Sequence, residues 1–262
     1  MKYKVIDGKG IIPDGTNEIA ESAFKGCTRL QSIVIPSSVT VIGSEAFSGC
    51  TSLQSIVIPD SVTRINYSAF SGCNNLTSII VSKNNSRYKS TNNCILTKDG
   101  KKLILCRSHN IPDSVTMIGD WAFKGCTSLQ SIIIPDSVTV IGGSAFSCTS
   151  LQSIVIPNGE TRIDTSTFEG CGGLQSIVIP DSVKEIGESA FSYCTSLQSI
   201  EIPDSVTKIK SHAFEGCTSL QSIVIPDRVT TIDSTAFKCC NNLTLIIVSK
   251  NNPEYKSTNN CM

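Results

Sequence analysis

The 262-residue sequence contains only two histidines and one tryptophan, and it carries no net charge. The two histidines, His109 and His212, stand far apart in the sequence, which argues against a histidine-based metal site or acid–base catalyst. The 22 basic residues balance the 22 acidic ones, so no overall field attracts nucleic acid or an anionic membrane. These absences remove several functional classes.

Motifs of nucleotide-binding and nucleophilic enzymes are also missing. There is no Walker phrase and no glycine-rich loop of the dinucleotide-binding type. One row of serines recurs at a fixed position of the phrase, as at Ser32 and Ser55, but no base accompanies it, so a nucleophilic role has no support. No apolar run reaches the length of about 20 residues that a membrane-spanning helix needs. We therefore expect no enzyme activity, no cofactor, no metal, no nucleic-acid partner and no membrane insertion.

Phenylalanine is present in one slot of a repeated phrase. Two of the cleanest copies are SLQSIVIPDSVTRINYSAFSGC (residues 52–73) and SLQSIVIPDRVTTIDSTAFKCC (residues 219–240), and Pro13, Pro36 and Pro59 give a period of 23. A fixed period in this range is typical of a solenoid. The nine phenylalanines that share the slot are Phe24, Phe47, Phe70, Phe123, Phe146, Phe168, Phe191, Phe214 and Phe237.

One copy of the phrase predicts two extended segments and a turn. Residues 53–58 fit the L-x-x-L-x-L frame of a leucine-rich repeat, with Ile56 and Ile58 pointing inward and Val57 outward. Pro59 ends this strand because it lacks a backbone N–H. Residues 62–65 then form the opposite wall, and residues 68–70 form a single helical turn that buries Phe70. Stacked neighbours must cover each repeat.

Several segments depart from the period. Residues 82–111 form an irregular island that includes CILTKDGKKLILC (94–106), which reads as a hairpin projecting from the rod around Asp99-Gly100. Residues 241–262 are a truncated copy of this island, and residues 1–13 form an N-terminal hairpin cap. Between Phe146 and Cys148 the usual glycine is absent, which shortens a loop without disturbing the strands.

The phrases IPDSVTxIGxxAFxxCxxLxSI and VSKNNxxYKSTNN, with the KDG hairpin, resemble the BspA-like class of bacterial leucine-rich repeats over essentially the whole chain. The predicted fold is a mainly β, right-handed solenoid of about ten or eleven turns, with a parallel sheet and short helical turns. Residues 1–262 are expected to form one domain. The resemblance implies a protein-binding scaffold linked to adhesion or host-protein contact, and fold alone does not fix function.

Two indications about the compartment disagree. The resemblance implies the bacterial cell surface or secretion. The first eight residues, however, have no apolar signal region, and abundant thiols suit a reducing cytoplasm. The sequence leaves both compartments open.

Thirteen cysteines fall into two groups. We expect the first group to fill a buried core slot once per turn as reduced, unreactive small apolar side chains. Cys94 and Cys106 at the hairpin base are the only plausible disulfide, and the hairpin register decides whether it forms. Accessible thiols are expected at Cys94, Cys106 or Cys261. The first group is Cys27, Cys50, Cys73, Cys126, Cys148, Cys171, Cys194, Cys217 and Cys240.

The outward positions of the main sheet form a β-branched row that is the candidate partner-binding surface. This row can reflect β-propensity alone or a patch that faces a ligand. Glu201 interrupts it either as a specificity element or as a gatekeeper against sheet association. The candidate partner-binding residues on the concave face are Val57, Ile80, Ile133, Val155, Val178, Glu201 and Val224.

Two non-enzymatic functions are compatible with these patterns. The first is protein–protein binding, including surface adhesion, through the concave sheet. The alternative is a structural spacer or self-associating segment of a longer surface protein. The strand expected at residues 243–248 is an uncapped apolar edge, so it predicts a dimer or head-to-tail association.

Overall fold

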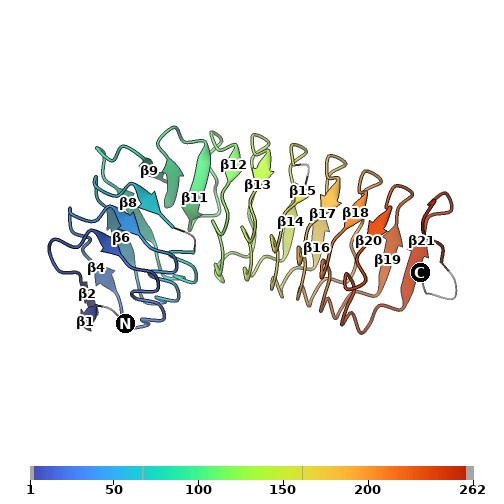
Figure 1. Ribbon diagram of the computed structural model, residues 1–262, viewed down its shortest axis with the longest axis horizontal. Coiled ribbons are helices and arrows are strands. Elements are labelled where there is room, and N and C mark those ends of the chain that lie inside the picture. The colour runs from blue at the N-terminus through green and yellow to red at the C-terminus, as the bar shows by residue number, and fades with distance from the viewer. Residues whose placement is uncertain (1–2, 67, 161, 258–262) are drawn as a thin grey trace. The chain divides into compact units, whose positions relative to one another are not determined.

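The computed structural model describes residues 3–66, 68–160 and 162–257 of the chain (Figure 1). It is a β-solenoid of about ten turns built from repeats of about 23 residues, and no helix occurs in the described ranges. The chain separates into two compact units, Met1–Ser128 and Leu129–Met262. Below they are unit 1 and unit 2, and a single continuous domain stays a prediction.

Unit 1 contains short strands on two walls. One wall is built from the LQSIVIP segments and the other from the VTxI segments, and the two names are used below. The LQSIVIP wall holds β2, β4, β6 and β8, and β1 joins it at the N-terminal end. The strands are β1 (Lys4–Ile6), β2 (Lys9–Ile11), β3 (Glu18–Ile19), β4 (Ser32–Ile33), β5 (Val41–Ile42), β6 (Ser55–Ile58), β7 (Arg64–Ile65), β8 (Ser78–Val81), β9 (Tyr88–Thr91), β10 (Cys94–Thr97), β11 (Lys102–Cys106) and β12 (Met117–Ile118).

Equivalent strands of successive turns pair in parallel, as a solenoid requires. On the LQSIVIP wall β2 pairs with β4 and β6 with β8, and on the VTxI wall the order is β3-β5-β7. The predicted N-terminal hairpin is confirmed, because β1 and β2 pair antiparallel around Asp7 and Gly8. Both turn residues have positive φ, 47° and 75°, which suits the tight two-residue connection.

The island hairpin joins the VTxI wall rather than projecting from it. Strands β10 and β11 pair antiparallel, as predicted, but β11 also pairs in parallel with β12, in a sheet that includes the order β9-β10-β11-β12. The expectation of a projecting hairpin was therefore wrong. The reason is that β11 takes the place of a regular strand of the VTxI wall, and its backbone N–H and C=O groups form hydrogen bonds with β12.

The SxAF segments form consecutive turns, not the short helical turns that the sequence suggested. Each turn is closed by bonds such as Lys25 N–H to Ser22 O at 3.1 Å and Cys27 N–H to Phe24 O at 3.0 Å. The residue two before each phenylalanine except Phe237 is left-handed, with φ of 55° at Ser22 and 56° at His212. A right-handed helix cannot pass through that conformation, so the segment stays a turn.

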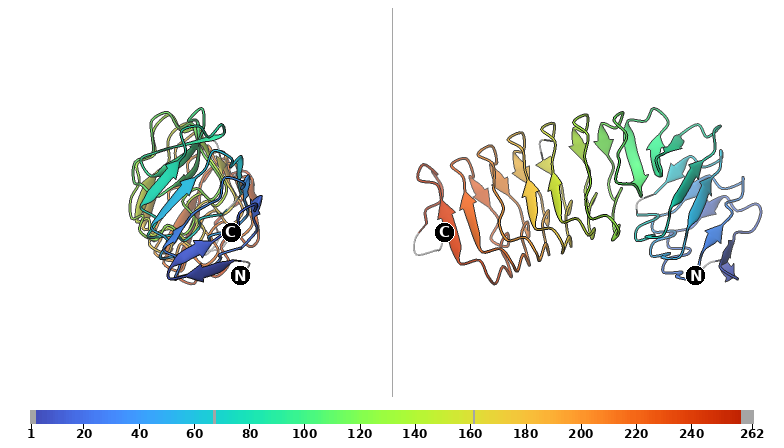
Figure 2. Two further views of the ribbon diagram at one scale, coloured as in Figure 1. Left: turned by 90° about the vertical axis from the view of Figure 1, so that its left-hand side faces the viewer. Right: turned by 180° about the vertical axis from the view of Figure 1, so that it is seen from behind.

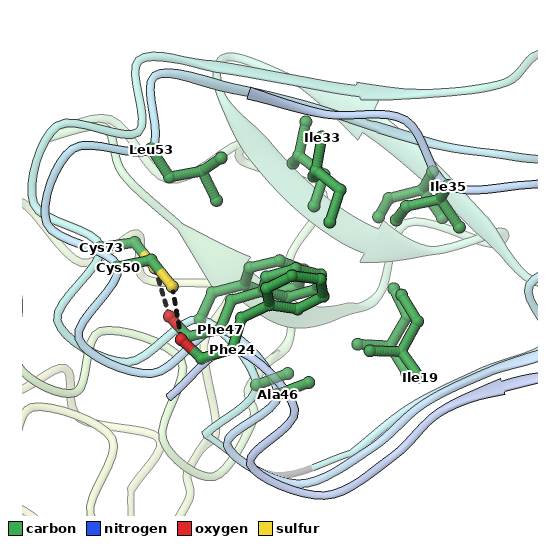
Figure 3. Close-up of a cluster of buried hydrophobic side chains, with 14 of the residues drawn as sticks. Ile19, Phe24, Ile33, Ile35, Ala46, Phe47, Cys50, Leu53 and Cys73 are labelled. Atoms are coloured by element: carbon green, nitrogen blue, oxygen red, sulfur yellow. Dashed lines mark hydrogen bonds between the residues drawn. The ribbon is translucent and has the colours of Figure 1, made fainter. Parts of the chain in front are cut away.

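The core of unit 1 consists of one apolar set repeated in every turn. Figure 3 shows Phe24 and Phe47 lying over each other between Leu53 on one side and Ala46 on the other. The rings of Phe24, Phe47 and Phe70 stack with centroids 5.4 and 5.3 Å apart, and all three are at most 2% exposed. The predicted buried phenylalanine column is confirmed here.

Unit 2 repeats the same two walls without an island between its turns. Strands β14 and β16, and β19 and β21, pair on the LQSIVIP wall, while the VTxI wall contains the order β15-β17-β18-β20. Figure 2 shows these strands side by side from behind. They are β13 (Val140–Ile141), β14 (Ser153–Val155), β15 (Arg162–Ile163), β16 (Ser176–Val178), β17 (Glu185–Ile186), β18 (Lys208–Ile209), β19 (Ser222–Ile225), β20 (Thr231–Ile232) and β21 (Leu245–Val248).

Unit 2 contains an aromatic stack of the same kind, with nearly constant spacing. Phe168 lies between Phe146 and Phe191, with centroids 5.6 and 5.4 Å away. Phe214 and Phe237 extend the stack at 5.4 Å each. Phe237 is only partly buried, whereas the other four are fully buried. Parallel register therefore places the same ring in the same core slot in every turn.

Candidate binding surface

The candidate surface is the outer side of the LQSIVIP wall. In unit 1, Val57 is 52% exposed and Ile80 is 51% exposed, and the register of β6 and β8 places the two directly opposite each other. Their neighbours Ile56 and Ile58 are buried. Alternation along a strand causes this contrast, because successive side chains point to opposite faces.

Unit 2 presents the same row on its own LQSIVIP wall. Val155 and Val178 are opposite each other in β14 and β16 and are 63% and 57% exposed. Val224 and Ile247 are likewise opposite in β19 and β21. Ile133 is also exposed. Each apolar candidate of unit 2 thus points outward, so the wall offers apolar contact area to solvent.

Glu201 is the one charged residue in this row. It is exposed and lies in a shallow groove with Ser199, Asp204, Ser222 and Val224. The sequence left its role open between specificity and gatekeeping. Its groove adds a second acidic side chain, Asp204, which the sequence reasoning did not include among the candidates. The position after each proline is the signal that would have found Asp204.

The first group of cysteines, called the column cysteines below, do more than fill a core slot. Six of these thiols donate to the phenylalanine carbonyl of the preceding turn. Figure 3 draws the bonds from Cys50 to Phe24 and from Cys73 to Phe47, each at 3.1 Å. In unit 2, Cys194 donates to Phe168 at 3.2 Å. Sequence reasoning missed this bond, because a thiol donor and a small apolar side chain leave the same sequence pattern.

Burial makes these thiols poor nucleophiles. It raises the pKa of Cys50 and of Cys217 to about 12, with neighbouring column thiols adding to the shift. It also raises the pKa of Cys73 and of Cys171 to about 11. Since the thiolate is the reactive form, these side chains serve structure rather than chemistry.

Cys148 does not belong to the buried column, contrary to the sequence prediction. It is exposed and has φ of 56°, which is the left-handed position that Gly170 takes in the next turn with φ of 70°. Thr149 occupies the buried slot instead and is 3% exposed. The missing residue therefore follows that slot, and the threonine hydroxyl, 3.3 Å from the thiol of Cys171, replaces the expected thiol.

Among the described residues, the second exposed thiol belongs to Cys239 and not to the hairpin. Cys239 also has a left-handed backbone, with φ of 59°, and is exposed, while Cys240 is only partly buried. Cys94 and Cys106 are buried and face each other across the hairpin, joined by a disulfide with an S–S distance of 2.08 Å. The expectation that these two are accessible was wrong. Cys261 lies outside the described residues.

A small cavity in unit 1 lies where the island meets the preceding turn. Its volume is about 100 Å³, and its lining includes Phe70, Leu105 and Trp121, with Lys102 and Asp120 also present. Sequence reasoning did not single out Trp121, although it is the only tryptophan in the chain. At this size the cavity holds a few water molecules, so it is not the candidate surface.

Metal-binding clusters and membrane-spanning helices are absent from the described ranges. These ranges hold no group of three or more His, Cys, Asp or Glu side chains arranged to bind a metal ion. They also hold no helix with the length and apolar character needed to span a membrane.

The repeat phrases match a known family over most of the chain. Residues 9–98, 102–194 and 161–260 match the BspA type leucine rich repeat region, in six copies. The chain belongs to the BspA type leucine rich repeat family. This family is typically non-enzymatic. A comparison with curated proteins found no match.

Solved structures support the fold of this BspA type protein. A leucine rich cell surface protein from Faecalibacterium prausnitzii is 34% identical, with a TM-score of 0.64 over 91% of this chain; the match spans 59% of that longer protein. A leucine-rich repeat protein from Eubacterium ventriosum is 23% identical, with a TM-score of 0.64 over 88% of this chain and 82% of its own.

The third similar structure is the pneumococcal vaccine antigen PcpA. It is 20% identical, and the alignment covers 84% of this chain and 68% of PcpA with a TM-score of 0.63. At this identity the likeness to PcpA, like that to the E. ventriosum protein, shows the fold alone. The family and these structures identify a repeat protein similar to bacterial cell-surface proteins.

Proposed function

We propose that this BspA type protein is a non-enzymatic scaffold that binds another protein through the outer side of its LQSIVIP wall. The observation that carries the proposal is the exposed apolar row, in which Val155 and Val178 lie opposite each other and are more than half exposed. Exposed apolar rows on a sheet favour association with a partner. The similarity to the F. prausnitzii cell surface protein supports adhesion as the setting.

A charge-insertion experiment tests this proposal. The variant Val155→Glu with Val178→Glu places two carboxylates in the row and leaves the buried core untouched, so the fold is expected to persist. The matched control is Val140→Glu with Thr231→Glu, which places the same charges at exposed positions of the VTxI wall. Circular dichroism and a urea melt establish that both variants fold.

The readout is capture from a bacterial and host surface-protein extract, quantified by mass spectrometry. The expected result is at least one protein that the wild type and the control retain and the row variant loses. Identical capture profiles for all three chains would show that the LQSIVIP wall is not the binding surface.

Self-association as a surface spacer is the second candidate, and the exposed row of β21 favours it. Leu245 and Ile247 are 40% and 43% exposed on this strand. The association predicted through residues 243–248 remains a proposal. Light scattering over a concentration series tests it, because a monomer at every concentration would exclude both the dimer and the head-to-tail arrangement.

A further inference from the structure

Acidic side chains accompany the apolar row of unit 2. The residue after the proline of each phrase lies where the strand leaves the LQSIVIP wall, and in three successive turns it is Asp181, Asp204 and Asp227. Parallel strands are about 4.8 Å apart, so these carboxylates form a line along the stack. Asp136 continues the pattern earlier in the unit, and Asn158 stands between.

Glu201 widens this line into a patch. It replaces the valine of its turn and shares a groove with Asp204. The neighbouring outward residues of that groove are Ser199, Ser222 and Val224, which carry no charge. Four carboxylates therefore gather over three turns beside apolar side chains, and below they are the acidic patch: Asp181, Glu201, Asp204 and Asp227.

The acidic patch differs from Glu185 and Glu215 of unit 2 because its carboxylates form no ion pair within the described ranges. On and next to the VTxI wall, Glu185 pairs with Lys210 at 2.7 Å and with Arg162 at 3.3 Å. Glu215 pairs with His212 at 2.9 Å and with Lys238 at 3.4 Å. Among the ion pairs of the described residues, none involves a carboxylate of the acidic patch.

Two cations lie near the patch, but in the part of the chain that the structure describes neither forms an ion pair with a patch carboxylate. The ammonium of Lys184 lies 3.4 Å from the backbone carbonyl of Asp181, and Arg228 is the exposed residue next to Asp227. Hydrogen bonding by Ser249, and to a smaller extent by Asn251, lowers the pKa of Asp227 and so favours its charged form. Like charges at this spacing repel by about 1 kcal/mol even in water.

We propose that the LQSIVIP wall of unit 2 binds a polypeptide segment that carries lysine or arginine beside apolar side chains. The apolar part packs on Val155, Val178 and Val224, and the cations lie over the acidic patch, where they replace repulsion by attraction. This inference rests on the proposed function, because it names the chemistry of the partner for the same wall.

The test uses two short synthetic peptides of defined chemistry. One is built of leucine and lysine, and its twin has glutamate in place of every lysine, so apolar content and length are equal. Fluorescence anisotropy measures binding to the full chain at about 0.1 M and about 1 M salt, where the Debye length falls from about 10 Å to about 3 Å. The lysine peptide is expected to bind at the lower salt only, and the glutamate peptide at neither.

Two matched variants localise the effect. Glu201→Gln with Asp204→Asn neutralises half of the patch and is expected to weaken binding of the lysine peptide about tenfold, which is a moderate change for two rim charges. Glu169→Gln with Glu188→Gln removes the same charge from outside the LQSIVIP wall and is expected to leave the affinity unchanged. Equal weakening by both pairs, or equal binding of both peptides, overturns the inference.

Failure here is distinct from failure of the proposed function. If a captured protein is lost by the Val155→Glu, Val178→Glu variant but kept by the patch-neutralised variant, the wall binds a partner that does not need the acids. In that case the scaffold proposal stands and the cationic partner is excluded. If neither variant changes capture, both proposals fail.

Discussion

The regular turns of unit 2 and the island of unit 1 hold their backbones together in different ways. In unit 2 each turn offers the next one the same partners: Phe168 N–H donates to Ala190 O at 2.9 Å, and Phe191 N–H donates to Ala213 O at 2.8 Å. At the island, the guanidinium of Arg107 donates to Phe70 O at 2.6 Å. In regular turns a cysteine thiol donates to the equivalent phenylalanine carbonyl, as Cys50 does to Phe24 O. Regular turns are held together by backbone hydrogen bonds that follow from the strand register alone, whereas the irregular island needs a specific side chain to bond the carbonyl of Phe70.

The two copies of the island phrase show the same side-chain solution. Asn85 is fully buried and donates to Pro59 O at 2.8 Å and to Val62 O at 2.9 Å, while its own oxygen accepts from two later amides. Asn252 makes the matching bonds in unit 2, at 2.7 Å to Pro226 O and 3.0 Å to Val229 O. One asparagine thus replaces several ladder partners wherever the regular phrase stops.

The largest expected effect comes from breaking a regular turn at Phe168. Its ring is fully buried between two stacked neighbours. Phe168→Ala removes this burial and leaves a cavity, so it should lower the free energy of unfolding by about 3 to 5 kcal/mol. Urea melts followed by circular dichroism measure the change. A loss below about 1 kcal/mol would falsify the core assignment, and Val178→Ala on the exposed row is the control.

The next effect comes from breaking the island at its asparagine. Asn85→Ala and Asn252→Ala each leave two backbone carbonyls and two amides without their side-chain partner, at a cost of about 2 to 4 kcal/mol. Because Asn85 and Asn252 share the same four hydrogen bonds to backbone groups, hydrogen exchange should show similar local loss of protection in each unit. Residues 85–91 and 252–257 are the segments to follow.

The matched control for these variants is Asn84→Ala, at the exposed neighbour of Asn85. It should change the stability by less than about 0.5 kcal/mol. Equal effects of Asn84→Ala and Asn85→Ala would mean that the hydrogen bonds of the buried Asn85 side chain do not stabilise the island.

Much of this architecture can be predicted from the sequence because the same 23-residue pattern recurs many times. The nine phenylalanines and the alternation around Val57 predict the core column and the outward row, and the observed burial of the side chains agrees with both. The N-terminal hairpin is equally readable, since Asp7-Gly8 permits one tight turn. Pattern predicts well wherever register alone decides the structure.

What the sequence did not predict lies at single exceptions to the repeat. Periodicity cannot show that the island hairpin joins the VTxI wall, because β11 pairs through backbone groups common to all residues. It also misplaced Cys148, since the gap could lie before or after the buried slot and only packing decides. The binding role of the exposed row remains a proposal. The repeat copies are so similar that no residue of the row differs from its equivalents in a way that indicates recognition of a partner.

The smallest expected effect comes from a substitution at Cys148, the exposed cysteine with a left-handed backbone. An L-residue in the left-handed region carries a strain that glycine lacks, so Cys148→Gly should raise the stability by up to about 1 kcal/mol, after the loss of unfolded-state entropy that glycine brings. Cys148→Ser keeps the strain and should leave the stability unchanged. Native thiol labelling gives the second readout: the wild type should label rapidly at Cys148 and Cys239, among the described residues, and both variants should lose the first of these sites. Equal stability of the glycine and serine variants would contradict the strained turn, and rapid labelling of Cys50 or Cys217 would contradict the buried column beside it.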